Sequence, residues 1–142
     1  MASGRRLLTR QWWETERTHF ALLVSSVTEA ELREGNFPRQ DECLKMVRRL
    51  RYLPITKAAQ RMAEQLLTCR IVPASKPRDA LQLAMATVHD VDYLLTWNYA
   101  HLANPQVQER LRKVCQKSAL RCPILVSPET IPHVRLGQTI RR

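Results

Sequence analysis

The sequence predicts an α/β protein in which helices cover both faces of a parallel sheet. Short apolar runs alternate with longer segments of helical periodicity, the pattern of strands joined by helices. One segment, residues 80–88, is apolar on nearly all sides, which is typical of a buried helix. Apolar residues make up 44% of the 142-residue chain, enough to bury one core.

The first half of the chain is expected to hold four helices and two strands. Residues 9–20 and 28–34 are the first two helices, the second opened by the capping-box spacing of Thr28 and Glu31. Pro38 opens the third helix and Thr56 caps the fourth. The inward positions of the fourth helix are expected to be Ala59, Met62, Ala63 and Leu66. The strands are expected at 21–25 and 52–55, the latter kept to an edge by Pro54.

The second half is expected to add two helices and two strands. Pro77 and Asp79 open the apolar helix that ends at Val88. Asn104 and Pro105 open a helix with a basic outer face. The strands are expected at 92–97 and 123–127.

The composition and the N-terminus exclude several classes of protein. The longest apolar run, Phe20–Val24, is far shorter than the ~18 residues that span a bilayer. The basic start lacks the apolar stretch of a secretory signal. Cys43, Cys69, Cys115 and Cys122 form no Cys-x-x-Cys pair and are expected to be reduced thiols. We therefore expect a cytoplasmic protein without membrane contact, with one domain over residues 1–131 and a basic tail over 132–142.

Positive charge is concentrated in two segments. The chain has 23 Lys and Arg against 13 Asp and Glu, a net charge of +10. Residues 33–61 and 105–142 each hold eight Lys or Arg, whereas residues 81–104 hold none. Basic surface attracts polyanions and releases counterions on binding. We expect nucleic-acid contacts, with solvated helix faces as the alternative, from Arg48, Arg49, Arg51, Arg112 and Lys113.

Acidic and polar residues follow two of the predicted strands. Glu31 comes after the first strand, Thr96 and Asn98 end the third, and Asp79 opens the helix that leads into the third. Ligands of parallel α/β sheets bind outside the carboxyl ends of the strands, so we expect these groups to converge. Carboxylates suit Mg²⁺, which activates water for attack on a phosphodiester.

Each of these residues also has a purely structural alternative. A helix macrodipole favours Asp79 in a first turn, whether or not it binds a ligand. Glu31 completes a capping box, and Asn98 is a common turn or cap residue. The residues alone leave both interpretations open.

Two stretches of the sequence resemble the PIN domain. They are Asp79-Ala-Leu-Gln-Leu-Ala and Val91-Asp-Tyr-Leu-Leu-Thr-Trp-Asn-Tyr-Ala-His-Leu-Ala-Asn104. Residues 9–14, 24–31 and 122–129 support the resemblance, which covers about residues 5–131. The chain looks most similar to VapC-like proteins, the toxin class of bacterial toxin–antitoxin pairs.

The resemblance implies a three-layer fold and a ribonuclease that depends on Mg²⁺ or Mn²⁺. By motif, Glu31 and Asp79 match metal-binding acids, and Asn98 stands where many members have a further Asp. Thr96 would support the site through its hydroxyl. Because Asn is neutral, the resemblance leaves the number of metal ions open. It also implies RNA as substrate, a cognate antitoxin as partner and a homodimer as a further assembly.

The family's opening strand, which bears its first catalytic acid, has no counterpart before Thr9. In the family this strand lies mid-sheet, between the strands expected here at 21–25 and 92–97. Either the true start lies upstream of Met1, or the domain is shortened. Translating the upstream genomic DNA in frame distinguishes these explanations, because only the first requires a strand with an Asp or Glu there.

Three interpretations of the chain remain open at this point. The first is a toxin-type ribonuclease, and the second is a catalytically incomplete PIN-like module that binds RNA or protein. Salt-dependent RNA binding without metal-dependent turnover distinguishes the second from the first. The third is a fragment that does not fold alone, which a cooperative melt would exclude.

Overall fold

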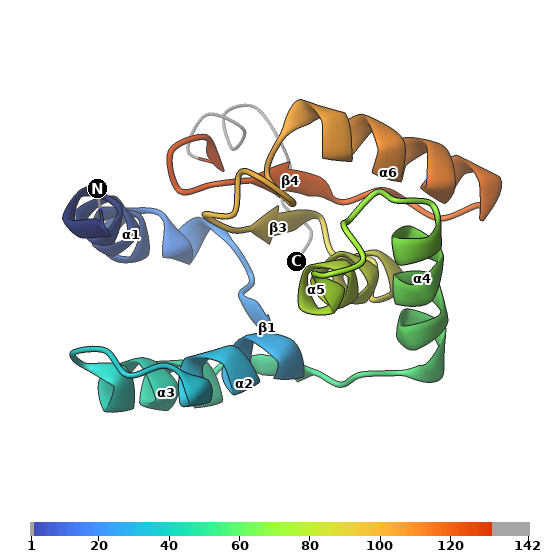
Figure 1. Cartoon of the computed structure of the whole chain (residues 1–142). Helices are drawn as coiled ribbons and strands as arrows, with labels where there is room; N and C mark the ends of the chain where they lie inside the picture. The colour runs from blue at the N-terminus through green and yellow to red at the C-terminus, as the bar shows by residue number, and fades with distance from the viewer. Residues whose placement is uncertain (1, 132–142) are drawn as a thin grey trace. The chain divides into compact units, whose positions relative to one another are not determined.

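A computed structural model describes residues 2–131, and these divide into two compact units (Figure 1). One unit joins the residues up to Ala21 with those from Asp90 onward, and the other spans Leu22–His89. The first unit contains α1 (Ala2–Thr15), the 3₁₀-helix η1 (Arg17–His19), β3 (Tyr93–Leu95), α6 (Pro105–Lys117) and β4 (Ile124–Val126). The second contains β1 (Leu23–Ser25), α2 (Ser26–Glu34), α3 (Gln40–Arg48), β2 (Arg51–Leu53), α4 (Lys57–Thr68) and α5 (Pro77–Val88).

The α/β class is confirmed. Within residues 2–131 the strands form two parallel pairs, one in each unit. In the second unit Val24 of β1 is opposite Tyr52 of β2, and in the first unit Leu94 of β3 is opposite Leu125 of β4. A three-layer arrangement around one sheet remains a prediction. The predicted basic tail, residues 132–142, lies outside the described residues.

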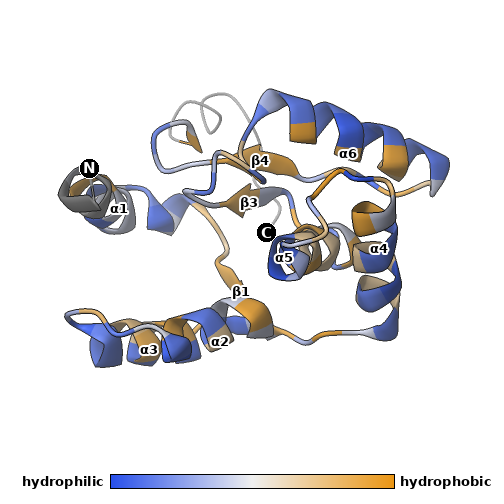
Figure 2. Ribbon diagram, in the orientation of Figure 1, coloured by the Kyte–Doolittle hydropathy of each residue, from blue (hydrophilic) through white to orange (hydrophobic). Residues whose placement is uncertain are grey.

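Two buried helices form the centre of the second unit. Thr56 accepts a hydrogen bond from the Ala59 N–H and so caps α4, as predicted. The four positions predicted to point inward on α4 are all buried: Ala59, Met62, Ala63 and Leu66. The next helix, α5, packs against α4 and is apolar over most of its surface (Figure 2). Its buried residues are Ala80, Leu83, Ala84, Met85, Ala86 and Thr87, which confirms the predicted buried helix.

A stripe of contacts joins α2 to α5 within this unit. Val27 of α2 belongs to one buried cluster with Met85 of α5 and Ala59 of α4. One turn further along α2, Glu31 accepts a hydrogen bond from Gln82 of α5 at 3.0 Å. Val27 and Glu31 are four positions apart on α2, and Gln82 and Met85 are three apart on α5, so each pair lies on one face of its helix. The contacts advance along α2 as they go back along α5. The two helices therefore run antiparallel along this stripe.

The predicted capping box of α2 is wrong in register. The helix begins two residues earlier than predicted, and Ser25 is its cap, accepting a hydrogen bond from the Thr28 N–H at 3.2 Å. Ser25 keeps the extended backbone of β1, which leaves its hydroxyl free to turn onto the first N–H groups. Glu31 consequently lies inside the helix and has no capping role.

Two further helix starts differ from the sequence prediction. α1 begins at Ala2 and ends at Thr15, whereas the prediction was 9–20, because the first residues lack a clear apolar period. Residues 17–19 form a separate 3₁₀ turn. Pro38 lies in the turn before α3, and Arg39, whose backbone is left-handed with φ of 65°, is the N-cap residue that precedes the helix.

Aromatic and charged contacts hold the first unit together. The Phe20 ring lies 5.9 Å from that of Trp12 and 6.1 Å from that of Tyr93, which connects α1 to β3. Arg121 donates to Asp90 at 2.8 Å and also pairs with Asp92, so it joins the approaches to β4 and β3. Both ion pairs raise the pKa of Arg121.

The outer face of α6 is hydrophilic (Figure 2) and, as predicted, carries several exposed Lys and Arg side chains. Asn104 caps this helix by accepting from the Val107 N–H at 2.9 Å. Its buried residues are Val107, Leu111, Val114 and Cys115. All four cysteines are free thiols, and burial raises the pKa of Cys122. None of the helices in residues 2–131 is both long and apolar enough to cross a membrane.

Replacement of Leu66 by Ala tests the core of the second unit. Leu66 is fully buried on α4, so Leu66→Ala is expected to lower the free energy of unfolding by about 2–5 kcal/mol. Urea denaturation of the full chain, followed by circular dichroism, measures this change. The control is Gln60→Ala on the exposed side of the same helix, with an expected effect within about 0.5 kcal/mol. Equal effects of the two substitutions would contradict this core.

Candidate metal and nucleic-acid site

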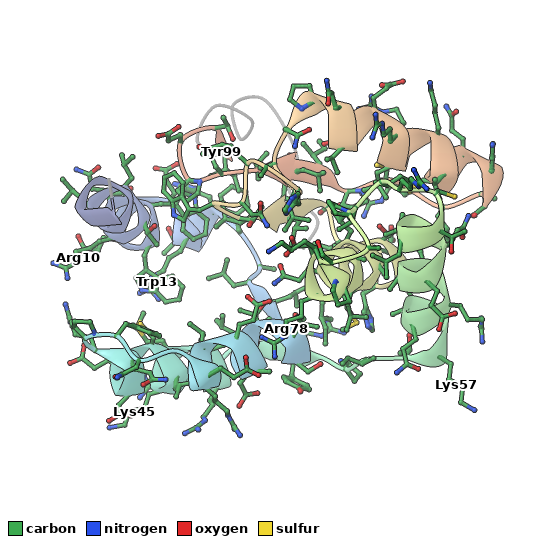
Figure 3. The ribbon with its side chains drawn as sticks, viewed as in Figure 1. Arg10, Trp13, Lys45, Lys57, Arg78 and Tyr99 are labelled. Atoms are coloured by element: carbon green, nitrogen blue, oxygen red, sulfur yellow. The ribbon has the colours of Figure 1, made fainter. Side chains whose placement is uncertain are left out.

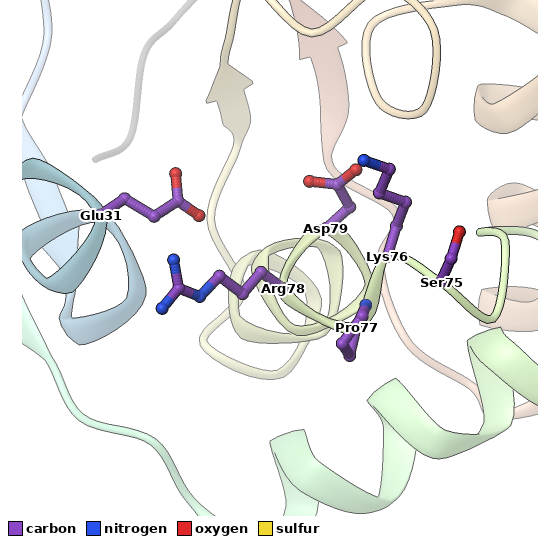
Figure 4. Close-up of a pocket in the computed structure, with 6 residues that line it drawn as sticks. All are labelled: Glu31, Ser75, Lys76, Pro77, Arg78 and Asp79. Atoms are coloured by element: carbon purple, nitrogen blue, oxygen red, sulfur yellow. The ribbon is translucent and has the colours of Figure 1, made fainter. Parts of the chain in front are cut away.

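The structure brings together two of the acids predicted to bind metal. Glu31 of α2 and Asp79 of α5, far apart in the sequence, line one open pocket in the second unit. The other residues that line it are Ser75, Lys76, Pro77 and Arg78 (Figure 4). The pocket therefore forms where the N-terminus of α5 lies beside α2.

Local sequence places Asp79 at the start of α5. Pro77 is the first residue of the helix, where its missing N–H costs nothing and its fixed φ suits the helix. Asp79 is the third residue and is half-buried. Lys76 precedes the helix and provides no side-chain cap. A carboxylate in this first turn interacts favourably with the helix macrodipole, as the structural alternative for Asp79 required.

A hydrogen bond orients the acid contributed by α2. Glu31 is exposed, and its Oε1 accepts a hydrogen bond from Gln82 Nε2 at 3.0 Å. Gln82 lies one turn after Asp79 on α5, so this bond holds the Glu31 carboxylate toward the helix that carries the second acid. Glu31 thus has a tertiary contact in place of the capping role considered for it.

Two cations share the pocket with the two acids. Arg78 donates two hydrogen bonds to Glu34 of α2, one at 2.6 Å between Nη1 and Oε2. This pair lowers the pKa of Glu34, and Glu34 together with Glu31 raises the pKa of Arg78. Figure 4 shows Arg78 extending toward Glu31, and Lys76 on the side of the pocket that Asp79 faces. Sequence reasoning missed both cations, although they flank Pro77 directly before Asp79.

The donor set of the pocket fits a hard divalent cation. Mg²⁺ commonly uses one or two carboxylates and keeps several waters, and the pocket offers the Glu31 and Asp79 carboxylates. No group of three or more His, Cys, Asp or Glu side chains arranged around a common point occurs in the described part of the chain. The pocket thus offers a two-carboxylate site at most, with Lys76 and Arg78 reducing its negative potential.

Thr96 and Asn98 belong to the first unit, where they shape the turn after β3. Thr96 Oγ1 accepts from the Asn98 N–H at 3.1 Å, and Asn98 Oδ1 accepts from the His101 N–H at 3.0 Å. The Asn98 carbonyl also accepts from Ala103 at 2.7 Å. Thr96 therefore supports Asn98, and Asn98 has the turn-capping role that was its structural alternative.

A polar cluster that the sequence did not reveal lies at the same strand ends. The Tyr99 hydroxyl lies 2.9 Å from both Ser127 Oγ and Glu129 Oε2, one turn beyond β3 and β4. The phenol is the donor toward both oxygens, Ser127 Oγ and Glu129 Oε2. Nearby, Trp97 Nε1 donates to Thr9 of α1 at 2.7 Å. No spacing in the sequence pairs these residues, because they come from three distant segments.

The predicted nucleic-acid-binding cations are all exposed. Arg48, Arg49 and Arg51 lie at the junction of α3 and β2 in the second unit. Arg112 and Lys113 lie on α6 in the first unit, where Arg112 pairs with Glu109 at 2.9 Å. Nucleic-acid contacts and solvated helix faces both require exposed side chains, so this exposure does not distinguish the two interpretations.

No protein-family model matches the chain, and searches of curated proteins and of solved structures find no match to it. A functional conclusion therefore depends on the pocket, the charge distribution and the motif resemblance described above.

Replacement of Arg78 tests the electrostatics of the pocket. Arg78→Gln is expected to raise the pKa of Glu34 toward its ordinary value, because the hydrogen bond from Arg78 is the main cause that lowers it. The ion pair adds stability above the ordinary carboxyl pKa and loses it as the pH falls through the lowered pKa of Glu34. Carboxyl-carbon NMR titration of the full chain measures this.

The matched control for this titration is Arg33→Gln, since Arg33 pairs with Glu29 on the same helix. It removes one positive charge from α2 and is expected to leave the titration of Glu34 nearly unchanged. An identical Glu34 titration in the wild type and in Arg78→Gln would contradict the ion pair.

Proposed function

We propose that the chain is a PIN-domain endoribonuclease that depends on Mg²⁺ or Mn²⁺ and acts as the toxin of a toxin–antitoxin pair in the cytoplasm. The observation that carries the proposal is the shared pocket of Glu31 and Asp79. The resemblance names these same two residues as metal-binding acids. Both are carboxylates, the ligand type that suits a hard divalent cation, and they line the same pocket.

Each residue of the pocket has a role in this proposal. Glu31 and Asp79 hold the metal ion, and Gln82 keeps the Glu31 carboxylate oriented through its N–H. When bound, the metal lowers the pKa of a water and stabilises charge on the phosphodiester. Lys76 provides a positive charge for a phosphate oxygen at the rim of the pocket.

The remaining parts of the proposal come from the resemblance. It assigns Asn98 and Thr96 to the catalytic residues, and it predicts a three-layer PIN-like fold over residues 1–131. A small antitoxin is the proposed protein partner, and a homodimer is the proposed assembly. The net charge of +10 supports RNA as the substrate, because basic proteins attract and retain polyanions.

A second function is supported by the charge balance of the pocket. Two cations, Lys76 and Arg78, accompany the two acids, and a pocket of this kind can hold a phosphate without a metal ion. The chain would then be a PIN-like module that binds RNA or a protein partner without cleaving RNA. Metal-dependent turnover is what separates the two functions.

Cleavage of a labelled single-stranded RNA by the full chain tests the first proposal. Asp79→Asn and Glu31→Gln are each expected to reduce Mg²⁺-dependent cleavage about 100-fold or more, because each removes a metal ligand while keeping the size of the side chain. The control is Asp41→Asn, which neutralises an exposed acid at the start of α3. It is expected to cleave at the wild-type rate.

Two results would contradict the ribonuclease proposal. Equal cleavage by the wild type and Asp79→Asn would reject Asp79 as a ligand. Salt-dependent RNA binding by a wild type that shows no metal-dependent cleavage would favour the binding module.

A further inference from the structure

The side chain of Tyr52 is exposed on a strand that has an open edge. Tyr52 lies at the middle of β2 and is 49% exposed, whereas Val24, its partner in β1, is 8% exposed. In the described part of the chain, β2 pairs with a strand on one side alone. Ile55, two residues after the strand, is 41% exposed. Tyr52 and Ile55 together therefore leave apolar surface uncovered beside an open strand edge.

Four cations lie close to Tyr52 in the sequence. Lys45, Arg48 and Arg49 are spaced three and four residues apart, so they share one side of α3, and Lys45 extends from this helix into solvent (Figure 3). Arg51 directly precedes Tyr52 in β2 and is exposed, so its side chain leaves the strand on the face opposite the ring. The macrodipole of α3 accounts for cations in its last turn but not for Arg51, which belongs to the strand.

Two of these arginines are not engaged by acids. Arg48 lies 4.0 Å from Glu29, but neither Arg49 nor Arg51 forms an ion pair among residues 2–131. Their charges are therefore available to an external anion. Arginine binds phosphate through a planar fork of N–H donors, which a lysine or an apolar residue does not offer.

An exposed aromatic ring close in the sequence to unpaired arginines matches the chemistry of single-stranded nucleic acid. Single strands bind through bases that stack on aromatic rings and through phosphates that contact basic side chains. A duplex hides its base faces and offers the ring nothing to stack on. A protein partner would also cover Tyr52 and Ile55, but the uncompensated arginines close to them in the sequence favour a polyanion over an apolar surface.

We propose that single-stranded RNA docks along the open edge of β2, with a base stacked on Tyr52 on one face of the strand and phosphates bound by Arg49 and, across the edge, by Arg51. The surface would hold the strand while the acidic pocket acts on it. This inference rests on the proposed function only in taking RNA as the ligand, and it requires no cleavage.

Fluorescence anisotropy of a labelled single-stranded RNA, with EDTA present to prevent cleavage, tests the docking surface in the full chain. Tyr52→Thr removes the ring and keeps a residue suited to a strand, so RNA binding is expected to weaken about tenfold. Tyr52→Phe keeps the stacking ring and is expected to bind within about twofold of the wild type. Circular dichroism melting confirms that each variant folds.

A second pair of variants tests the arginines. The double substitution Arg49→Gln and Arg51→Gln is expected to weaken binding and to reduce the slope of log affinity against log salt by about 1.4, or about 0.7 for each phosphate contact. The matched control is the double substitution Arg33→Gln and Arg39→Gln, which removes the same charge from two arginines paired with Glu29 and Glu42. This control is expected to change the slope by less than half as much.

Four outcomes would overturn the inference. Wild-type affinity of Tyr52→Thr would reject stacking while leaving the ribonuclease proposal intact. Equal salt slopes for the two double variants would show that RNA binding depends on net charge and not on Arg49 and Arg51 in particular. Conversion of a wild-type dimer to a monomer by Tyr52→Thr, with RNA affinity unchanged, would make this surface a contact between two copies. Failure of the wild type to bind any RNA at low salt would contradict both this inference and the proposed function.

Discussion

The antiparallel packing of α2 against α5 is the interaction on which the candidate site depends. Val27 and Met85 anchor the two helices in the buried cluster. Beyond this anchor the facing positions become polar, first Glu31 with Gln82 and then an ion pair at the rim. The apolar contact therefore determines where the carboxylate of Glu31 lies. Because Asp79 is at the N-terminus of the same α5, the packing also places the second acid at the pocket.

The elements that could be predicted from the sequence are those with a strong local signal. Thr56 and Asn104 are caps followed by clear helical periodicity, and the structure confirms both. The start of α2 could not be predicted, because Ser25 and Thr28 both suit a cap and only the end of β1 decides between them. Residues 2–8 lack an apolar period, so the first half of α1 was missed as well. Strand pairing is non-local, and no local pattern specifies it.

The candidate site was predictable in part, where its residues carry a local signal in the sequence. Glu31 and Asp79 were identified from their positions relative to strands and from the motif resemblance, and they share a pocket. The cations beside them were missed because charged residues next to a Pro-initiated helix are common on solvated surfaces. Tyr52 was assigned to a strand, but its exposure depends on which strand edge is covered, and that is a tertiary property.

The central claim is that Glu31 and Asp79 hold one divalent ion together. The most direct test is the affinity of the full chain for Mn²⁺, measured by electron paramagnetic resonance of the free ion in the wild type, Glu31→Gln, Asp79→Asn and the double variant. We predict that each single substitution weakens binding at least about tenfold and that the double variant is little weaker than either, since two ligands of one ion act as a unit. Unchanged affinity in either single variant, or effects that add fully, would contradict the claim.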